Sequence, residues 1–197
     1  MHRWQPGLET VLAAVREVVP YEPAPPWKDV SESPRGAPEA ATRWLASYLL
    51  LRHRAVSAAV DYHHRASYAN ADLASLHATG RAIDLYIGKN PPSDEDLAEG
   101  DEIAVWLVTH AGVLGVQYVV WGATAWQGTG TLGAFSPYGG PDPHFARIHI
   151  ELTALGARGK TAFYAANGFV APPEPAIVPT ARDTLPAPPE SASEPAA

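Results

Sequence analysis

Apolar residues recur at helical spacing in three stretches of the chain. Residues 8–19, 39–54 and 94–111 each place them three or four positions apart, which puts them on one side of a helix. Ser93 precedes the third stretch as a capping residue, and acidic residues follow it near the positive end of the predicted helix. Gly112 is the expected end of that helix.

Other stretches alternate between apolar and polar residues or are rich in β-branched residues, as strands are. These patterns predict strands over residues 55–63, 81–87, 115–121 and 145–152. Because the predicted helices and strands are interspersed, the expected fold class is α+β, a small antiparallel sheet with flanking helices.

Proline-rich segments at both ends of the chain bound a single central domain. Residues 1–38 are expected to form an N-terminal helix and then a proline-rich strap without regular structure, because proline lacks a backbone donor. Residues 39–168 are expected to form the domain. Residues 169–197 consist largely of Pro, Ala, Glu and Ser, a composition that cannot bury enough apolar area to offset chain entropy, so a disordered tail is expected.

The composition suits one globular domain and restricts its chemistry. The chain has 197 residues, of which 46% are hydrophobic and 18% are charged, and this length fits one domain with tails. It contains no cysteine. Disulfides, zinc–thiolate sites and cysteine nucleophiles are therefore excluded, and a transition metal would have to bind His, Asp or Glu.

The charge and hydropathy of the chain argue against two kinds of partner. A net charge of -7 with 14 scattered Lys and Arg residues argues against a nucleic-acid partner. No stretch reaches the roughly 18 to 20 apolar residues of a membrane span. The first residues lack the plan of a secretory signal. The protein is therefore expected to act in the cell that makes it or to leave that cell by a route other than a secretory signal. It is also expected to be a monomer.

One run of residues carries most of the candidate chemistry. His77 lies in a predicted loop and Asp84 in the strand that follows, so both can bind one ion if the chain turns at Gly80. His149 is a candidate third ligand, because alternation places it on the polar side of the last predicted strand. Two imidazoles and one carboxylate suit catalytic zinc, which leaves a fourth position for water. A His and an Asp at this spacing also occur together by chance, so the spacing alone leaves open a domain without metal.

The same run resembles the signature of a known family. Its fixed residues match the pattern S-x-H-x-x-G-x-A-x-D of the zinc D-alanyl-D-alanine carboxypeptidases and their lysostaphin-like and hedgehog-like relatives. The matching residues are Ser75, His77, Gly80, Ala82 and Asp84. The likeness extends over residues 40–155 and includes a C-terminal part that ends at His149. It implies a hedgehog-like or D,D-peptidase-like fold in which His77, Asp84 and His149 bind Zn2+.

The resemblance also implies roles for residues near the ligands. Relatives often carry an upstream arginine that holds a substrate carbonyl or carboxylate, and Arg65 matches that place, with a solvated loop cation as the alternative. Relatives usually end in H-x-H, and here Arg147 replaces the first histidine. Arginine has no lone pair and cannot act as a general base, although it can stabilise an oxyanion. His144, which matches a family histidine, and Glu151 are the candidates for proton transfer, and Glu151 also fits a surface strand residue.

The implied function is that of a zinc peptidase acting at the cell wall. Such an enzyme would hydrolyse amide bonds in peptidoglycan stem peptides, as a D-Ala-D-Ala carboxypeptidase or as an endopeptidase. A phage lytic enzyme and a bacterial wall-remodelling enzyme both fit. The alternative is a binding or structural module of the same fold, for example a phage tail or wall-binding component, that keeps zinc and has lost turnover. Arg147 is the residue that favours this alternative.

Overall fold

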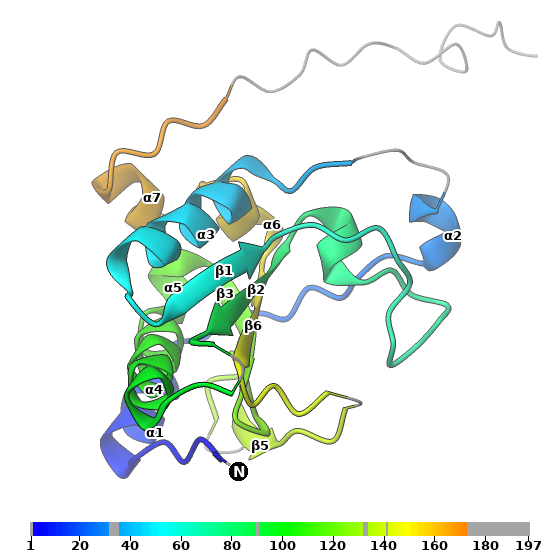
Figure 1. Ribbon diagram of the computed structural model, residues 1–197. Coiled ribbons are helices and arrows are strands. Elements are labelled where there is room, and N and C mark those ends of the chain that lie inside the picture. Colours follow the sequence, from blue (N-terminus) through cyan, green and yellow to red (C-terminus); the bar gives the residue numbers. More distant parts are fainter. Residues whose placement is uncertain (1, 32–35, 90, 132–133, 141, 173–197) are drawn as a thin grey trace, which may run out of the picture.

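The fold is built on one antiparallel sheet. The computed structural model describes residues 2–31, 36–89, 91–131, 134–140 and 142–172. Within them, strands pair in the order β1-β2-β6-β3-β4-β5, and every neighbouring pair is antiparallel (Figure 1). The strands are β1 (Val56–Val60), β2 (Ala82–Ile87), β3 (Val116–Trp121), β4 (Thr124–Gln127), β5 (Phe135–Pro137) and β6 (Arg147–Leu152). With its flanking helices, this sheet confirms the α+β class.

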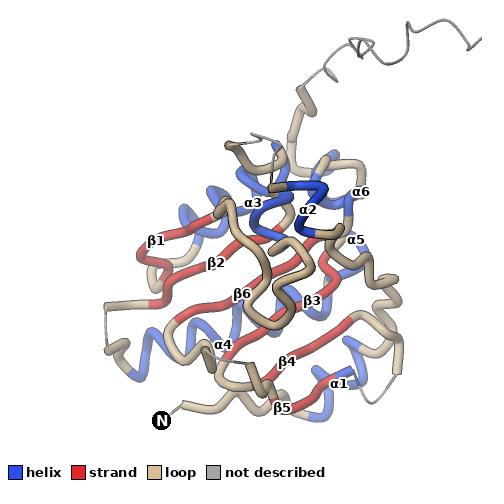
Figure 2. The backbone as a smooth tube through the Cα atoms, turned by 90° about the vertical axis from the view of Figure 1, so that its right-hand side faces the viewer, coloured by secondary structure: helices blue, strands red, loops and turns tan. Residues whose placement is uncertain are grey.

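The longer helices gather on one face of the sheet. The helical elements are α1 (Leu8–Ala14), α2 (Trp27–Val30), α3 (Ala40–Arg52), the 3-10 turn η1 (Leu76–Thr79), α4 (Asp94–Thr109), α5 (Ala111–Leu114), α6 (Ala154–Ala157) and α7 (Ala162–Ala166). Figure 1 shows the sheet nearly edge-on with α3, α4, α5 and α7 on one side, and Figure 2 looks onto the other side, where α2 and long loops lie. Within the described part of the chain, no helix is long and apolar enough to cross a bilayer.

Strand alternation directs one set of side chains into the helical layer. Ile148 and Ile150 on β6 are fully buried, as are Ile83 and Leu85 on β2. The same core cluster contains the buried residues of α3 and α4, among them Leu45, Leu49, Ile103 and Leu107. Because burying one such side chain contributes roughly 1.5–3 kcal/mol, the helix-covered face supplies most of the hydrophobic stabilisation of the fold.

The first helix is shorter than its apolar pattern predicts. The pattern covers residues 8–19, whereas α1 ends at Ala14. Val18 and Val19 leave the helix to pair with the segment that follows β4, where Val19 N donates to Gly128 O at 2.9 Å. A contact with a distant segment therefore overrides the local helical periodicity.

The third predicted helix begins as expected and ends differently. Ser93 caps α4 through a capping box with Asp96. The helix is interrupted at His110, and α5 continues it to Gly115, which has a φ of 72°. Gly112 lies inside α5 rather than at the end of the helix. Gly115 ends it because glycine adopts the left-handed conformation without strain.

The proline-rich strap crosses the face of the sheet opposite the long helices. Contrary to expectation it contains a short helix, α2, whose first residue Trp27 donates its backbone N–H to Asp72 O at 2.7 Å. Glu22 fastens the strap to the sheet end. Its carboxylate lies 3.0 Å from the Arg81 guanidinium and accepts from Ala154 N at 2.7 Å.

The described chain ends against the helical layer. Phe169 packs edge-on against Trp44 and Tyr164, with ring centroids 5.9 and 5.7 Å apart. The contacts of the domain therefore reach one residue beyond the expected boundary at 168. The rest of the expected tail, from residue 173 onward, lies outside the described residues.

Candidate metal centre

Two candidate ligands lie side by side at the centre of the open face, which is the face opposite the long helices. Asp84 on β2 and His149 on β6 are directly opposite each other in the antiparallel register. Their strand neighbours Leu85 and Ile148 point into the helical layer, so Asp84 and His149 leave the sheet on the other side. Since β6 lies between β2 and β3, His149 stands in the middle of the sheet.

A short turn brings His77 to the same place. His77 lies in η1, which ends at Gly80 with a φ of 72°. A Cβ atom on residue 80 would lie 2.7 Å from the backbone nitrogen of Glu39, so glycine is needed for both conformation and space. One ligand atom from each of His77, Asp84 and His149 lies within 4.8 Å of the others. The structure thus brings the three predicted ligands into a cluster that could hold a metal ion.

His77 is buried without hydrogen bonds. Its side chain is 2% exposed, and among the described residues neither ring nitrogen has a hydrogen-bond partner. Its Nε2 lies 3.5 Å from Asp84 Oδ2, which is long for a hydrogen bond. Burial lowers the pKa of His77 and so favours the neutral ring with a free lone pair. An unsatisfied buried polar group costs roughly 1–3 kcal/mol, and a metal ion bound by the ring would remove that cost.

Asp84 and His149 form a pair that stabilises positive charge at this position. Asp84 Oδ1 and His149 Nδ1 are hydrogen-bonded at 2.9 Å. Burial opposes ionisation of Asp84, but the neighbouring imidazoles outweigh it and lower the pKa of the carboxyl. Burial also disfavours a charged His149, but hydrogen bonds with Asp84 and Glu151 raise its pKa to about 9. The protonated His149 ring therefore lies between two carboxylates, and a metal ion can replace the proton on Nδ1.

Arg147 lies beside the ligands rather than among them. Its Nη1 is 3.2 Å from Asp84 Oδ2, and its Nη2 pairs with Asp142 and lies 3.3 Å from His144 Nε2. Burial opposes its charge, but Asp84 and Asp142 outweigh it and raise the pKa of Arg147. A permanent positive charge is therefore fixed next to the candidate ligands.

His144 is held against the same cluster in an unusual backbone conformation. It has a φ of 57°, which is uncommon outside glycine, and its backbone N donates to Asp142 Oδ1 at 3.0 Å. Its ring centroid lies 5.8 Å from that of His149. Burial, followed by the charges of His149 and Arg147, lowers the pKa of His144 to about 4. The ring is therefore neutral at neutral pH and can accept a proton only weakly.

Arg65 is less closely connected with the cluster. Its guanidinium lies over the Tyr68 ring at 3.9 Å from the centroid and donates to Ala66 O. Its charge contributes, after burial and other groups, to the lowered pKa of His77, which places it near that ligand. Its direct contacts are therefore those of a loop cation, near the site but bound to its own loop.

Two residues of the site are not indicated by any functional pattern in the sequence. Asp142 holds both Arg147 and His144, and its position two residues before His144 is the only local signal for it. Tyr21 comes from the strap and lies near Glu151 and Tyr118, whose ring centroid is 6.4 Å from its own. No local pattern could link residue 21 with residue 151, because they meet only in the folded chain.

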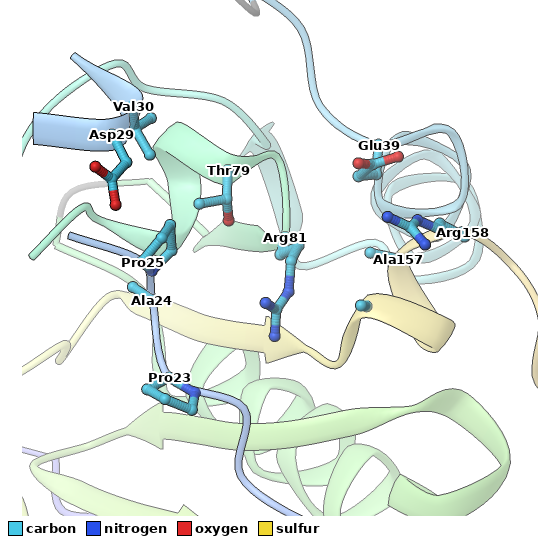
Figure 3. Close-up of a pocket in the computed structure, with 11 residues that line it drawn as sticks. Pro23, Ala24, Pro25, Asp29, Val30, Glu39, Thr79, Arg81, Ala157 and Arg158 are labelled. Atoms are coloured by element: carbon cyan, nitrogen blue, oxygen red, sulfur yellow. The ribbon is translucent and has the colours of Figure 1, made fainter. Parts of the chain in front are cut away.

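A cavity of about 580 Å³ is lined in part by η1, the turn that carries His77 (Figure 3). Its lining comes from the strap, α2, the start of α3 and α6, and includes Thr79 and Arg81. These two residues flank Gly80 in the turn between His77 and Asp84. The three candidate ligands are not part of the lining, so the cavity does not contain the cluster.

Fold and cluster together define an α+β protein with a His/Asp/His group able to bind a metal ion. The family described as "VldE, C-terminal domain" matches residues 42–148, which is more than half of the chain, and the chain belongs to that family. The match includes His77 and Asp84 and ends one residue before His149. No curated protein and no solved structure matches the chain.

Proposed function

We propose that this protein is a zinc-dependent peptidase that hydrolyses amide bonds in the stem peptides of peptidoglycan. One observation carries the proposal. The residues of the signature that resembles the D-alanyl-D-alanine peptidases, His77 and Asp84, meet His149 on the open face of the sheet with ligand atoms within 4.8 Å. If the signature matched by chance, there would be no reason for the distant His149 to lie next to His77 and Asp84.

The donor set favours zinc over other common ions. Two imidazoles and one carboxylate suit a borderline-soft ion that binds three protein ligands and keeps one position open, whereas Mg2+ and Ca2+ prefer oxygen ligands. The carboxylate of Asp84 within the cluster and those of Asp142 and Glu151 beside it are negative, and Arg147 supplies one positive charge, so a divalent ion suits the charge balance. When bound, zinc would lower the pKa of a water molecule and polarise the amide carbonyl.

The neighbouring side chains have separable roles in this proposal. Arg147, held by Asp84 and Asp142, stabilises the negative charge that develops on the carbonyl oxygen. His144 is neutral and takes part in proton transfer on the same side of the sheet. Arg65 binds a carboxylate of the substrate. Because Arg147 stands where relatives usually carry a histidine, the proton-transfer step differs from theirs.

The second candidate function is a zinc-binding module without turnover. It is favoured by the same Arg147, since both terminal nitrogens of the guanidinium are engaged with Asp84 and Asp142 and arginine cannot accept a proton. In this case the open face binds a wall peptide without cleaving it. The two candidates share the ligands and differ only in product formation.

The deciding experiment combines metal analysis with a search for products. Purified protein is analysed for bound zinc and incubated with peptidoglycan, and the fragments are identified by mass spectrometry. Free D-alanine indicates a carboxypeptidase, and cleaved cross-links indicate an endopeptidase. Asp84→Asn should abolish both zinc and products, whereas Asp72→Asn, in an exposed loop, should change neither. Wild-type protein that holds zinc, binds stem peptides and releases no fragment would support the binding module instead.

A further inference from the structure

The geometry points to Glu151 as the residue that positions His149 for metal binding, by accepting a hydrogen bond from Nε2 and so leaving Nδ1 free as the ligand. This inference rests on the metal site of the proposed function. In this inference Glu151 is neither a proton-transfer group nor a surface residue of the strand, but a residue that orients a metal ligand.

The two nitrogens of His149 have different carboxylate partners. Nδ1 is 2.9 Å from Asp84 Oδ1, within the cluster of candidate ligands. Nε2 is 3.2 Å from Glu151 Oε1. A neutral imidazole carries one proton, and the nitrogen without it supplies the lone pair. A carboxylate can only accept, so Glu151 keeps the proton on Nε2 and directs the lone pair of Nδ1 to the metal.

The sheet places Glu151 where this contact can form. Glu151 and His149 are two residues apart on β6 and therefore leave the strand on the same face. On the neighbouring strand β2, the residue opposite Glu151 is Ala82, one of the fixed positions of the signature. Because alanine has only a methyl group, it leaves room for the Glu151 side chain to lie along the strand toward His149.

The strap encloses Glu151 from the other side. Its side chain is 13% exposed, and burial together with the Glu151 charge raises the pKa of Tyr21 in the strap to about 12. Tyr21 therefore stays protonated and can donate to the carboxylate. On β3, Tyr118 stands opposite Glu151, and burial and the same charge also raise its pKa, so a second neutral phenol faces the carboxylate. These neighbours limit the water that could compete for Nε2, and among the described residues the second carboxylate oxygen, Oε2, is buried without a hydrogen-bond partner.

The position of Glu151 argues against a direct part in the reaction. Its Oε1 contacts the edge of the ring opposite Nδ1, so the imidazole lies between this oxygen and the ligand cluster. A carboxylate behind a ligand orients that ligand and strengthens its donor atom. Loss of such a partner typically weakens metal binding by about 10- to 100-fold.

The test compares zinc affinity, measured by competition with a chelator, in wild type, Glu151→Ala, Glu151→Gln and Glu99→Ala. Glu99 is the matched control because it lies 3.3 Å from His53 in another carboxylate–histidine pair, outside the site. We expect Glu151→Ala to bind zinc about 10- to 100-fold more weakly, and Glu99→Ala to bind it as wild type does. Glu151→Gln should lie between, because its amide oxygen can still accept from Nε2.

Nitrogen NMR of the histidines in the zinc-bound protein supplies a readout that general destabilisation would not produce. Wild type should show His149 with a protected Nε2–H and zinc at Nδ1, and Glu151→Ala should lose that protection. Zinc affinity of Glu151→Gln and Glu151→Ala within twofold of wild type, or zinc bound at Nε2, would overturn the inference.

If the affinity falls as expected but wild type cleaves no stem peptide, the positioning role holds and the peptidase proposal fails. If wild type cleaves stem peptides but the affinity is unchanged, the peptidase proposal holds and the positioning role fails.

Discussion

The two faces of strands β2 and β6 place neighbouring residues in opposite surroundings. Leu85 and Ile148 are opposite each other in the register, fully buried under the helices. One step along the same strands, Asp84 and His149 are opposite each other on the open face, among carboxylates, imidazoles and a guanidinium. The two pairs are consecutive in the same antiparallel ladder and point to opposite sides of the sheet.

Because of this difference, substitutions on the two faces should affect different properties of the protein. An apolar residue of similar volume can replace another under the helices with modest loss, because packing there depends on volume and shape. On the open face Asp84, His149 and Arg147 are joined by hydrogen bonds and ion pairs, so a change of one charge leaves another unpaired. The helix-covered face should therefore respond to substitution mainly in the free energy of unfolding, and the open face mainly in metal binding and turnover.

The largest expected effect is on the open face. Wild type should carry about one zinc ion per chain, and Asp84→Ala or His77→Ala should carry none, because the three-ligand set is then incomplete. Elemental analysis after dialysis measures this. Full zinc occupancy in both variants would refute the ligand assignment and with it the contrast between the two faces.

The next effect is on the covered face, one residue away. Leu85→Ala should lower the free energy of unfolding by about 2–5 kcal/mol, since it leaves a cavity under the helices, while the zinc content stays at about one per chain. Leu85→Met, which conserves volume, should cost less than about 1.5 kcal/mol. Denaturant unfolding of the metal-free and metal-loaded proteins provides the comparison. Loss of zinc from folded Leu85→Ala would show that the faces are not independent.

A smaller effect is expected from Arg147, which pairs with the candidate ligand Asp84 without being a candidate ligand itself. Arg147→Ala should lower turnover by about ten- to a thousandfold while zinc remains bound, as loss of one transition-state donor does. The measurement is the rate of fragment release, with zinc content checked in each variant.

Arg147→His separates the enzyme from the binding module. If wild type releases no fragment and Arg147→His does, the protein is a binding module and the histidine restores the missing base. If wild type is active and neither substitution changes its rate, Arg147 has no part in turnover and proton transfer must be assigned to His144.

The smallest effect should come from the C-terminal end. Truncation after Val170 should change the melting temperature by less than about 5 °C, a shift that corresponds to roughly 1 kcal/mol or more in a domain of this size. Truncation after Gly168 is the matched control, since it also removes Phe169 and its contacts with Trp44 and Tyr164, and should destabilise more. A fall in melting temperature of more than about 5 °C for the truncation after Val170 would mean that residues 171–197 dock on the domain.

The strand that carries the site could be predicted closely from the sequence. Alternation in residues 145–152 correctly divides Ile148 and Ile150 from His149, because period two is a property of any strand. The signature around His77 and Asp84 likewise predicts their convergence, with Gly80 as the turn that permits it. These features depend on local geometry, which a sequence encodes within a few residues.

Features that depend on distant partners could not be predicted in the same way. The strands β4 and β5 were not predicted, because they are short and are held by pairing with β3 and with each other. Asp142 belongs to the site through its contacts with Arg147 and His144, and Tyr21 through its contact with Glu151. The α4–α5 region ends at Gly115 and not at Gly112. A Cβ on residue 115 would lie 2.5 Å from Gly156 Cα, so glycine is required there. This close approach exists only in the folded chain and could not be predicted from the local sequence.

The anchoring of the strap by Glu22 also affects the order of folding. Glu22 accepts a hydrogen bond from Ala154, 132 positions later, and from the Gln117 side chain. During synthesis the strap leaves the ribosome first but cannot take up these contacts until most of the domain has been made. Contacts of such long sequence separation form late because closing the loop costs entropy before any bond is gained. The strap, which encloses Glu151, should therefore take up its final position last, after the sheet and its helical layer have formed.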